Sequence, residues 1–359
     1  MGKLFVVVGT RPEAIKLAPV IRALRTAGAT VTVCATGQHR TLAGEALAWF
    51  GLVPDLGLGP HPADLDGLSA SLLTAVGAAI DAEQPERVIV QGDTASALAG
   101  ALAAHHRRLP VAHVEAGLRS GDLAAPWPEE GNRRLIAALA DLHFAPTEVA
   151  AAALRAENIA AAAIHMTGNS GIDALRLIPP GPPPLDPGGR RLILVTCHRR
   201  ESFGRGIAGI AAALRALARR PDVTIALPLH PNPVVRAGLG ALDGVRLLDP
   251  LTYPDFVRLL AAAHLVLTDS GGVQEEAPAL GVPVLVLRDT TERPEGVAAG
   301  TARLVGTKAR RILAEACRLL DDPAAHAAMA RAHCPYGDGH AARRIAAVLK
   351  PLDSGRARP

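Results

Sequence analysis

The sequence predicts an α/β protein made of two doubly wound, Rossmann-like domains that face a central cleft. Short aliphatic runs alternate with amphipathic segments along nearly the whole chain, which is the pattern of βαβ units around a parallel sheet. The 359 residues, 49% of them hydrophobic, suffice for two domains with separate cores. A Pro/Gly-rich stretch at residues 178–191, IPPGPPPLDPGGRR, interrupts the alternation, which restarts beyond it.

Hydrophobic periodicity predicts each element of the first half. The aliphatic run at residues 4–8 predicts a buried strand, and Leu17, Val20 and Leu24 follow it at helical spacing. Gly28 ends this first helix. The same reasoning predicts strands at 30–35, 87–90, 111–114, 142–145 and 163–166, and helices at 40–50, 68–80, 95–105 and 131–139.

The second half repeats the pattern. Strands are expected at 192–195, 223–226, 245–248, 265–267, 282–286 and 302–305, and helices at 206–218, 256–263, 273–280, 308–320 and 323–330. Ile345, Val348 and Leu352 lie on one face of a last helix. The expected organisation is an N-terminal domain (1–177), a linker (178–191), a C-terminal domain (192–335), a helix packing back on the N-terminal domain (336–353) and a disordered tail (354–359).

Composition argues against several classes of function. The net charge of +4 comes from scattered basic residues, so no nucleic-acid partner is expected. The four cysteines are far apart without CxxC spacing, which predicts neither a metal site nor disulfides and fits a reducing compartment. No apolar run approaches the ~20 residues that cross a bilayer, and no signal peptide opens the chain. We therefore expect a cytoplasmic protein without a membrane partner.

The stretch at residues 264–280, HLVLTDSGGVQEEAPAL, combines a strand, a Gly-rich turn and a helix. Free backbone N–H groups and the positive end of a helix dipole then meet at an anion site, most often for phosphate. Gly271 and Gly272 allow a phosphate close to the backbone, and Ser270 can add a hydroxyl. Glu276, about one turn into the helix, can reach a ribose diol. This stretch alone leaves open an ordinary βα turn with a serine N-cap.

Ligands of open α/β sheets bind at the carboxyl ends of the strands, and charged residues gather at these positions. The first domain offers Arg11, Glu13, Gln38, His39, Asp93, Glu115, Arg119, Glu129, Glu130 and Arg133. The second offers His198, Arg199, Arg200, Glu201, His230, Tyr253, residues 270–276, Arg288, Asp289, Glu292 and Arg293. Arg11, His230 and the turn at 270–272 can neutralise a diphosphate.

The carboxylates facing such a site need an explanation. Asp93, Glu115 and Glu129 are costly beside a diphosphate unless they act as acids or bases or hold a metal. His198 adds a group that titrates near neutral pH. Glu130, in contrast, is expected to point to solvent or to cap its helix. The HRRE group that begins at His198 has an alternative interpretation as a salt-bridged loop.

Eight segments together carry a family resemblance: GTRPE, QGDT, HVEAGLRSGD…PWPEEGNR, TCHRRESFG, HPNP, LTYPDF, DSGGVQEEAPALGVPVL and RDTTERPEG. In this order and spacing, over essentially the whole chain, the protein resembles bacterial non-hydrolysing UDP-N-acetylglucosamine 2-epimerases. The resemblance implies the two-domain GT-B architecture, interconversion of UDP-GlcNAc and UDP-ManNAc, no nicotinamide or other cofactor, no metal, and a homodimer.

The resemblance also implies roles by position. The nucleotide-binding residues would be Arg11, His230, Ser270, Gly271 and Gly272 for the diphosphate, Glu276 for the ribose, and Tyr253 and Phe256 beside the uracil. The catalytic positions would be Asp93, Glu115, Glu129 and His198, with Arg133 alongside. The implied mechanism removes the proton from sugar carbon 2, expels UDP to leave a bound 2-acetamidoglucal, and adds UDP back while carbon 2 is reprotonated on the opposite face.

One departure from the family concerns regulation. Many members carry an allosteric UDP-GlcNAc site with a glutamine-histidine-arginine-glutamine group and an arginine on the following helix. Here the group reads Gln38-His39-Arg40-Thr41, and Ser69-Ala70-Ser71 stands where the arginine would be. We expect weak or no activation by UDP-GlcNAc. Three alternatives stay open: a UDP-sugar-dependent GT-B glycosyltransferase, a 2-epimerase of a UDP-diacetamido-uronic acid, and a catalytically silent nucleotide-sugar binder.

Overall fold

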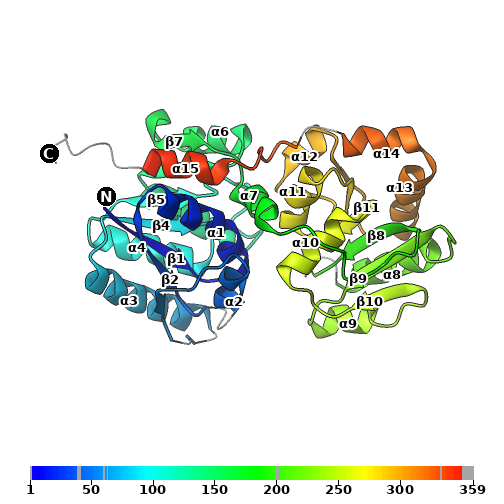
Figure 1. Cartoon of the computed structure of the whole chain (residues 1–359), viewed down its shortest axis with the longest axis horizontal. Helices are drawn as coiled ribbons and strands as arrows, with labels where there is room; N and C mark the ends of the chain where they lie inside the picture. Colours follow the sequence, from blue (N-terminus) through cyan, green and yellow to red (C-terminus); the bar gives the residue numbers. More distant parts are fainter. Residues whose placement is uncertain are drawn as a thin grey trace. The chain divides into compact units, whose positions relative to one another are not determined.

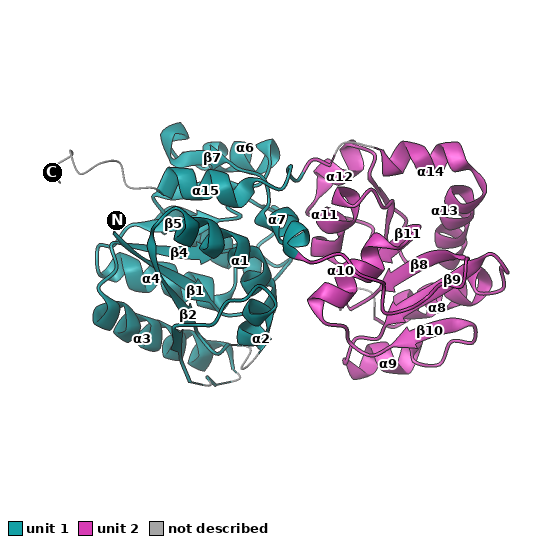
Figure 2. Ribbon diagram, viewed as in Figure 1, with its two compact units in different colours: residues 1–177, 336–359 teal, residues 178–335 magenta. Residues whose placement is uncertain are grey.

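A computed structural model describes residues 2–38, 42–59, 61–62, 64–198, 203–331 and 334–349. The chain forms two compact units (Figure 2): unit 1 contains residues 1–177 and 336–359, and unit 2 contains residues 178–335. Each unit has a parallel sheet flanked by helices (Figure 1), so the predicted class of two doubly wound α/β units is confirmed. Residues 178–190 contain neither helix nor strand. The predicted tail at 354–359 lies outside the described residues.

Unit 1 contains a seven-stranded sheet in the order β3-β2-β1-β4-β5-β6-β7. Its strands are β1 (Lys3–Val8), β2 (Thr30–Ala35), β3 (Leu56–Gly57), β4 (Arg87–Gln91), β5 (Val111–Val114), β6 (Leu142–Ala145) and β7 (Ile164–Met166). Its helices are α1 (Arg11–Thr26), α2 (Leu42–Ala48), α3 (Leu65–Glu83), α4 (Ala95–His106), α5 (Glu129–Leu139), α6 (Glu148–Ala156), the 3-10 helix η1 (Ala161–Ala163), α7 (Ser170–Leu177) and α15 (Ala341–Leu349). Phe5 and Val7 of β1 are fully buried in the core.

Unit 2 contains a six-stranded sheet in the order β10-β9-β8-β11-β12-β13. Its strands are β8 (Arg191–Thr196), β9 (Val223–Pro228), β10 (Val245–Leu248), β11 (Leu265–Thr268), β12 (Val284–Val286) and β13 (Ala302–Leu304). Its helices are α8 (Arg205–Leu217), α9 (Pro233–Leu239), α10 (Tyr253–Ala261), α11 (Gly271–Ala279), α12 (Pro294–Ala298), α13 (Ala309–Asp321) and α14 (Pro323–Ala330). The strand order reverses beside β1 in unit 1 and beside β8 in unit 2, where ligands of such sheets bind.

Several short helices were not predicted, among them α6, α7 and α9. Their hydrophobic stripes are too short for periodicity to show, and end caps help to hold two of them. Thr147 accepts a hydrogen bond from the Ala150 N–H at the start of α6 (3.2 Å), and Asn232 accepts one from the Val234 N–H at the start of α9 (2.9 Å).

Helix α3 is more apolar than expected. Among the described residues it is the one helix that is long and apolar enough, at a mean hydropathy of 1.3, to cross a membrane by length and composition. It lies against α4, however, and Val76 and Ile80 are buried in the core of unit 1. Covering helices of α/β units pass the same test, so this composition is weak evidence for a membrane span.

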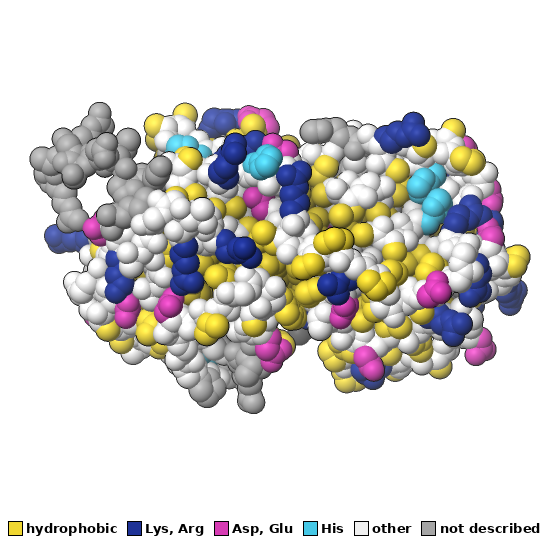
Figure 3. All heavy atoms as spheres, viewed as in Figure 1, with side chains coloured by type: hydrophobic (Ala, Val, Ile, Leu, Met, Phe, Trp, Pro, Cys, Tyr) yellow, Lys and Arg dark blue, Asp and Glu magenta, His cyan; other side chains and the backbone are white. Residues whose placement is uncertain are grey.

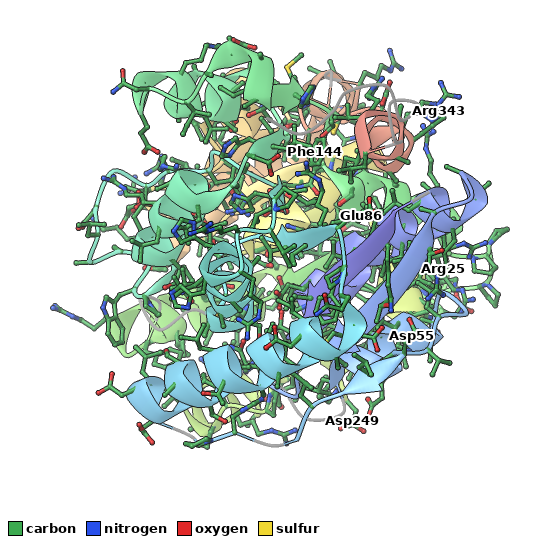
Figure 4. All side chains as sticks on the ribbon, turned by 90° about the vertical axis from the view of Figure 1, so that its left-hand side faces the viewer. Arg25, Asp55, Glu86, Phe144, Asp249 and Arg343 are labelled. Carbon is green, nitrogen blue, oxygen red and sulfur yellow. The ribbon has the colours of Figure 1, made fainter. Side chains whose placement is uncertain are left out.

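Charged side chains decorate both units without forming a continuous stripe of one sign on the face shown in Figure 3. Some form local ion pairs that join neighbouring elements. Arg25 at the end of α1 and Asp55 lie at the same edge of unit 1 (Figure 4), with 3.0 Å between Nη2 and Oδ2. The same Asp55 oxygen accepts a hydrogen bond from the Val33 N–H (2.8 Å), which ties the segment before β3 to β2.

Helix α15 follows the return of the chain to unit 1 and packs on α1 and α7. The Asp173 carboxylate of α7 receives its first backbone N–H groups, from Ala341 at 3.1 Å and Ala342 at 2.9 Å. A buried side chain from one helix therefore caps another that is distant in sequence.

We expect Asp173→Ala to lower the free energy of unfolding of unit 1 by about 1–2 kcal/mol, because two buried N–H groups lose their acceptor. Urea unfolding followed by tryptophan fluorescence reports on this unit, since both tryptophans, Trp49 and Trp127, belong to it. Asp338→Ala is the matched control: its ion pair with Arg344 is exposed, and exposed pairs contribute about 0–1 kcal/mol. Equal losses in the two variants would contradict the capping role.

Candidate active site

Glu115 stands directly after β5, at the carboxyl end of the unit 1 sheet. Its backbone lies in the left-handed region (φ 63°), which is unfavourable for a residue with a side chain and often marks functional sites. Its Oε2 accepts hydrogen bonds from Gln91 Nε2 (3.1 Å) and Asn169 Nδ2 (3.5 Å) and forms an ion pair with Lys16 Nζ. The Glu115 carboxylate is thus held beside the Lys16 ammonium.

Asp93 follows the neighbouring strand β4, and Arg133 of α5 holds it. Arg133 Nε (3.0 Å) and Nη2 both donate to Asp93 Oδ2. The side chain of Arg133 is 7% exposed and that of Asp93 is 25% exposed. Among the described residues, Asp93 Oδ1 has no partner. This oxygen is therefore available to a substrate while Oδ2 carries the ion pair.

Glu129 is the first residue of α5 and is half-buried. Within the part of the chain that the structure describes, no hydrogen bond or ion pair engages its carboxylate. The structure thus places the three predicted carboxylates of unit 1 in different settings. Asp93 is paired to a guanidinium, Glu115 to an ammonium, and Glu129 is unengaged.

The expectation that Glu130 points to solvent or caps its helix is wrong. Its side chain is fully buried and accepts hydrogen bonds from the Ser120 N–H (3.0 Å), Arg134 Nε (3.0 Å) and Arg133 Nη1 (3.2 Å). Burial alone would raise the pKa of this carboxyl, but the Ser120 N–H and the two guanidinium groups outweigh burial and hold the pKa below its usual value. Glu130 is an ionised carboxylate inside unit 1.

Glu13 in the first turn of α1 is a second buried carboxyl, 1% exposed. Its Oε1 accepts a hydrogen bond from Thr94 Oγ1 (2.9 Å) and its Oε2 one from the Gly9 N–H (3.2 Å). Burial outweighs these hydrogen bonds and raises the pKa of Glu13 to about 7. Glu13 thus joins the turn between β1 and α1, next to Arg11, to the loop after β4, which carries Asp93.

Two predicted arginines of unit 1, Arg11 and Arg119, contact other residues than the carboxylates described above. The Arg11 guanidinium carbon lies 4.9 Å from the centre of the Trp49 ring, in a cation–π arrangement. Arg119 forms a double hydrogen bond to Glu157, with distances of 2.6 and 2.7 Å. Arg119 is therefore paired with Glu157 and not with Asp93, Glu115 or Glu129.

Lys16, Gln91 and Asn169 are contacts of Glu115 that sequence reasoning missed. Lys16 lies one turn after Glu13 on α1, so helical spacing could have placed it near the same loops. Asn169 immediately precedes α7, which was itself not predicted, and no local pattern marks it.

Part of the segment linked to allosteric regulation lies outside the described residues, namely His39, Arg40 and Thr41. Gln38 Oε1 accepts hydrogen bonds from the Ser96 N–H (3.1 Å) and Oγ (2.7 Å). Ser71, at the position where an arginine would be expected, is hydrogen-bonded to His61 Nδ1 (2.7 Å). The Ser71 hydroxyl therefore already has a partner within unit 1, and weak activation stays a prediction.

In unit 2, the fully buried Asp269 organises the loop after β8. Its carboxylate accepts the His198 N–H at 2.9 and 3.1 Å, and its Oδ1 lies 3.1 Å from His198 Nδ1. The His198 ring stacks on the His230 ring with 5.7 Å between centroids. Burial and the neighbouring His198 lower the pKa of His230. The predicted Arg199, Arg200 and Glu201 lie outside the described residues.

Ser270 is the N-cap of α11 in extended conformation, but its side chain makes no capping hydrogen bond. The ordinary serine N-cap is therefore not observed. The Ser270 side chain leaves the first N–H groups of the helix available to another hydrogen-bond acceptor, such as a phosphate. A Cβ on Gly272 would meet no atom within 4 Å, whereas one on Gly271 would lie 2.8 Å from the guanidinium carbon of Arg293. Only Gly272 faces open space, while Gly271 makes room for Arg293.

Two glutamates fix Arg293 beside this turn. Its Nε donates to Glu275 Oε1 (2.8 Å), and its Nη1 lies 2.7 Å from Glu292 Oε1. The guanidinium thus lies in a set position beside the first turn of the helix, with its charge balanced by these carboxylates.

The residues expected near the base and the ribose are also placed. The Tyr253 hydroxyl donates to Glu276 Oε1 (3.0 Å), and Tyr253 as a whole residue is buried. Phe256 is half-buried against the core of unit 2. Tyr253 thus orients Glu276. No group of three or more His, Cys, Asp or Glu side chains with a metal-holding arrangement occurs among the described residues.

Glu13 gives a pH-dependent prediction. Its ordinary pKa of 4.5 rises to about 7 in the fold, so the fold favours the protonated form. The stabilisation that comes from this bound proton is complete below pH 4.5, and it is lost as the pH rises from there through the folded-state pKa of about 7. Glu13→Gln removes this pH dependence. When the pH is raised from about 5 to about 8, we therefore expect the free energy of unfolding of the variant to increase by about 2 kcal/mol relative to that of wild type.

Urea unfolding followed by tryptophan fluorescence measures this gain. Glu45→Gln, at an exposed position of α2, is the control and should follow wild type. A Glu13→Gln variant whose stability changes with pH in parallel with wild type would show that Glu13 does not titrate in this range.

The chain matches known proteins over nearly its full length. A family model described as UDP-N-acetylglucosamine 2-epimerase matches residues 22–350. The UDP-N-acetylglucosamine 2-epimerases of Escherichia coli K12 and Bacillus subtilis are 48% and 45% identical, over 97% of this chain and 98% and 94% of theirs. The Neisseria meningitidis UDP-GlcNAc 2-epimerase structure, bound to UDP-GlcNAc, superposes with a TM-score of 0.90 at 40% identity, covering 97% and 99% of the chains. This chain belongs to the UDP-N-acetylglucosamine 2-epimerase family.

Proposed function

We propose that this protein interconverts UDP-GlcNAc and UDP-ManNAc by elimination and re-addition of UDP. The observation that carries the proposal is Asp93: Arg133 holds one of its oxygens, and the other has no partner among the described residues. A carboxylate fixed in this way can take or return a proton at a defined position. Family membership and the solved Neisseria complex with UDP-GlcNAc support the choice of substrate.

The chemistry explains why several carboxylates lie at one sheet edge. A base removes the proton from carbon 2, the C–H electron pair forms the double bond to carbon 1, and the bond from carbon 1 to oxygen breaks with its electrons on UDP. The return reaction places a proton on the opposite face of carbon 2. Epimerisation therefore requires proton-transfer groups on both faces. We assign this work to Asp93, Glu115 and Glu129, without deciding which serves which face.

Unit 2 supplies the groups for the leaving diphosphate. The uncapped N–H groups of α11, the open side of Gly272 and the histidines His198 and His230 suit a phosphate whose negative charge grows as the bond breaks. Arg11 is assigned to the same diphosphate. Glu276, oriented by Tyr253, is assigned to the ribose hydroxyls, and Phe256 to the base.

We further propose a homodimer and a cytoplasmic location. The homodimer is supported by α3: only 22% of its 18-residue apolar window is buried within one copy, and another copy can cover such a surface. The cytoplasmic location is supported by the free thiols of Cys34, Cys197 and Cys317. Sedimentation equilibrium tests the dimer against the single-chain mass of 37.1 kDa.

The direct test is incubation with UDP-GlcNAc in deuterated water without an acceptor. NMR should show the manno epimer and deuterium at carbon 2. Unchanged UDP-GlcNAc would contradict the proposal, and turnover of a UDP-diacetamido-uronic acid in its place would redirect it to that substrate. A glycosyltransferase would need an acceptor and would leave carbon 2 unlabelled.

We expect Asp93→Asn to reduce deuterium exchange at carbon 2 by at least about 10³-fold, because the amide cannot take the proton. UDP affinity, measured by calorimetry, should change little, since Asp93 is not among the residues assigned to the nucleotide. Arg87→Gln, which removes a partly exposed ion pair on β4, the strand before Asp93, is the control. Wild-type exchange in Asp93→Asn would remove Asp93 from the catalytic set.

Glu276→Ala should weaken UDP binding by about tenfold or more, because the ribose loses its acceptor. Exchange at saturating substrate should fall less than the affinity. Calorimetry and saturation kinetics measure the two effects. Unchanged affinity combined with lower stability would show that Glu276 is only a structural partner of Tyr253.

A further inference from the structure

We propose that Glu130 is a positioning residue for the reaction: it fixes Arg133 so that the guanidinium holds Asp93 in a single orientation. The inference rests on the function proposed above. It concerns a buried carboxylate that makes no direct contribution to the proposed chemistry. Its support is the set of hydrogen bonds that Glu130 makes within unit 1.

Arg133 spans two carboxylates. Its Nε and Nη2 donate to Asp93, and its Nη1 lies 3.2 Å from Glu130 Oε2. Because the guanidinium is planar and its donors are fixed relative to one another, anchoring one end sets the direction of the other. Without Glu130, the buried Nη1 would lose its partner, and the group could turn away from Asp93 to regain one.

Glu130 also anchors the loop that leads to Glu129. The Ser120 N–H donates to Glu130 Oε2 at 3.0 Å, ten residues before it in the chain. The loop is braced internally, since the Asp122 N–H donates to Ser120 Oγ (3.2 Å) and the Ala124 N–H donates to Asp122 Oδ1 (2.9 Å). One buried carboxylate therefore touches both the partner of Asp93 and the loop that precedes Glu129.

Charge explains why this position takes a carboxylate. The alternation Asp93, Arg133, Glu130, Arg134 leaves each buried charge beside one of opposite sign. Arg134 lies at the outer end of this row, with a side chain 41% exposed. Loss of the Glu130 charge should therefore affect Arg133 and Asp93, whereas loss of Arg134 should affect only the outer end.

The test is Glu130→Gln, which keeps the shape and one acceptor but removes the charge. We expect kcat for epimerisation to fall about 10- to 100-fold, as for other residues that orient a catalytic group. KM for UDP-GlcNAc and the Kd for UDP should stay within about twofold. Assays run well below the unfolding temperature, with kcat expressed per UDP-binding site. Arg134→Gln is the matched control and should keep kcat within about twofold.

Lower thermal stability with an unchanged kcat per binding site would overturn the proposal and leave Glu130 a purely structural residue. If Glu130→Gln does not fold, Glu130→Asp replaces it. This variant keeps the charge and shortens the side chain by one methylene group, so we expect a smaller loss of kcat at unchanged KM. A wild-type kcat in Glu130→Asp would also overturn the proposal.

A crystal structure of the folded variant separates this inference from the proposed function. Arg133 displaced from Asp93 supports the positioning role even if the wild-type protein proves inactive on UDP-GlcNAc. Arg133 unmoved on Asp93 contradicts the positioning role even if the protein epimerises as proposed.

Discussion

The guanidinium of Arg133, held between Asp93 and Glu130, is the interaction on which the unit 1 site depends. Epimerisation on two faces of a sugar calls for several carboxylates at one sheet edge, and buried like charges repel and lose hydration. The fold meets this constraint with a separate solution for each group. Arg133 pairs with two carboxylates, Lys16 pairs with Glu115, and burial keeps a proton on Glu13 to about pH 7.

Unit 2 has the opposite task, because its proposed site must stabilise the negative charge of a diphosphate. The N-cap Ser270 leaves its helix uncapped, and Gly271 admits Arg293 against the first turn. The buried carboxylates beside this turn each have a partner: Asp269 contacts the backbone and imidazole of His198, while Glu275 and Glu292 pair with Arg293. In the proposed mechanism, carboxylates of unit 1 transfer the protons, while the N-terminus of α11, the two histidines and Arg11 stabilise the leaving group.

Much of this architecture is predictable from sequence because periodicity reports burial directly. Continuous aliphatic runs predicted the central strands, and strand ends predicted Asp93, Glu115 and the turn at 270–272. The other features of the site depend on contacts between residues that are distant in the sequence, and periodicity does not report such contacts. Glu130 has arginines three and four residues ahead, which indicates ion pairs, but its burial depends on a loop anchored through Ser120. Asn169 reaches Glu115 only because α7 packs beside α1, a contact that no local pattern encodes.

In the proposed mechanism, the bond between the sugar and UDP breaks and re-forms at every turnover. UDP-GlcNAc labelled with oxygen-18 in the atom that bridges carbon 1 and the β-phosphate tests it most directly. We expect the label to appear in non-bridging β-phosphate positions of the recovered nucleotide sugar at a rate comparable to epimerisation, since the freed phosphate can rotate before re-addition. Formation of the manno epimer with the label still wholly in the bridge would contradict it.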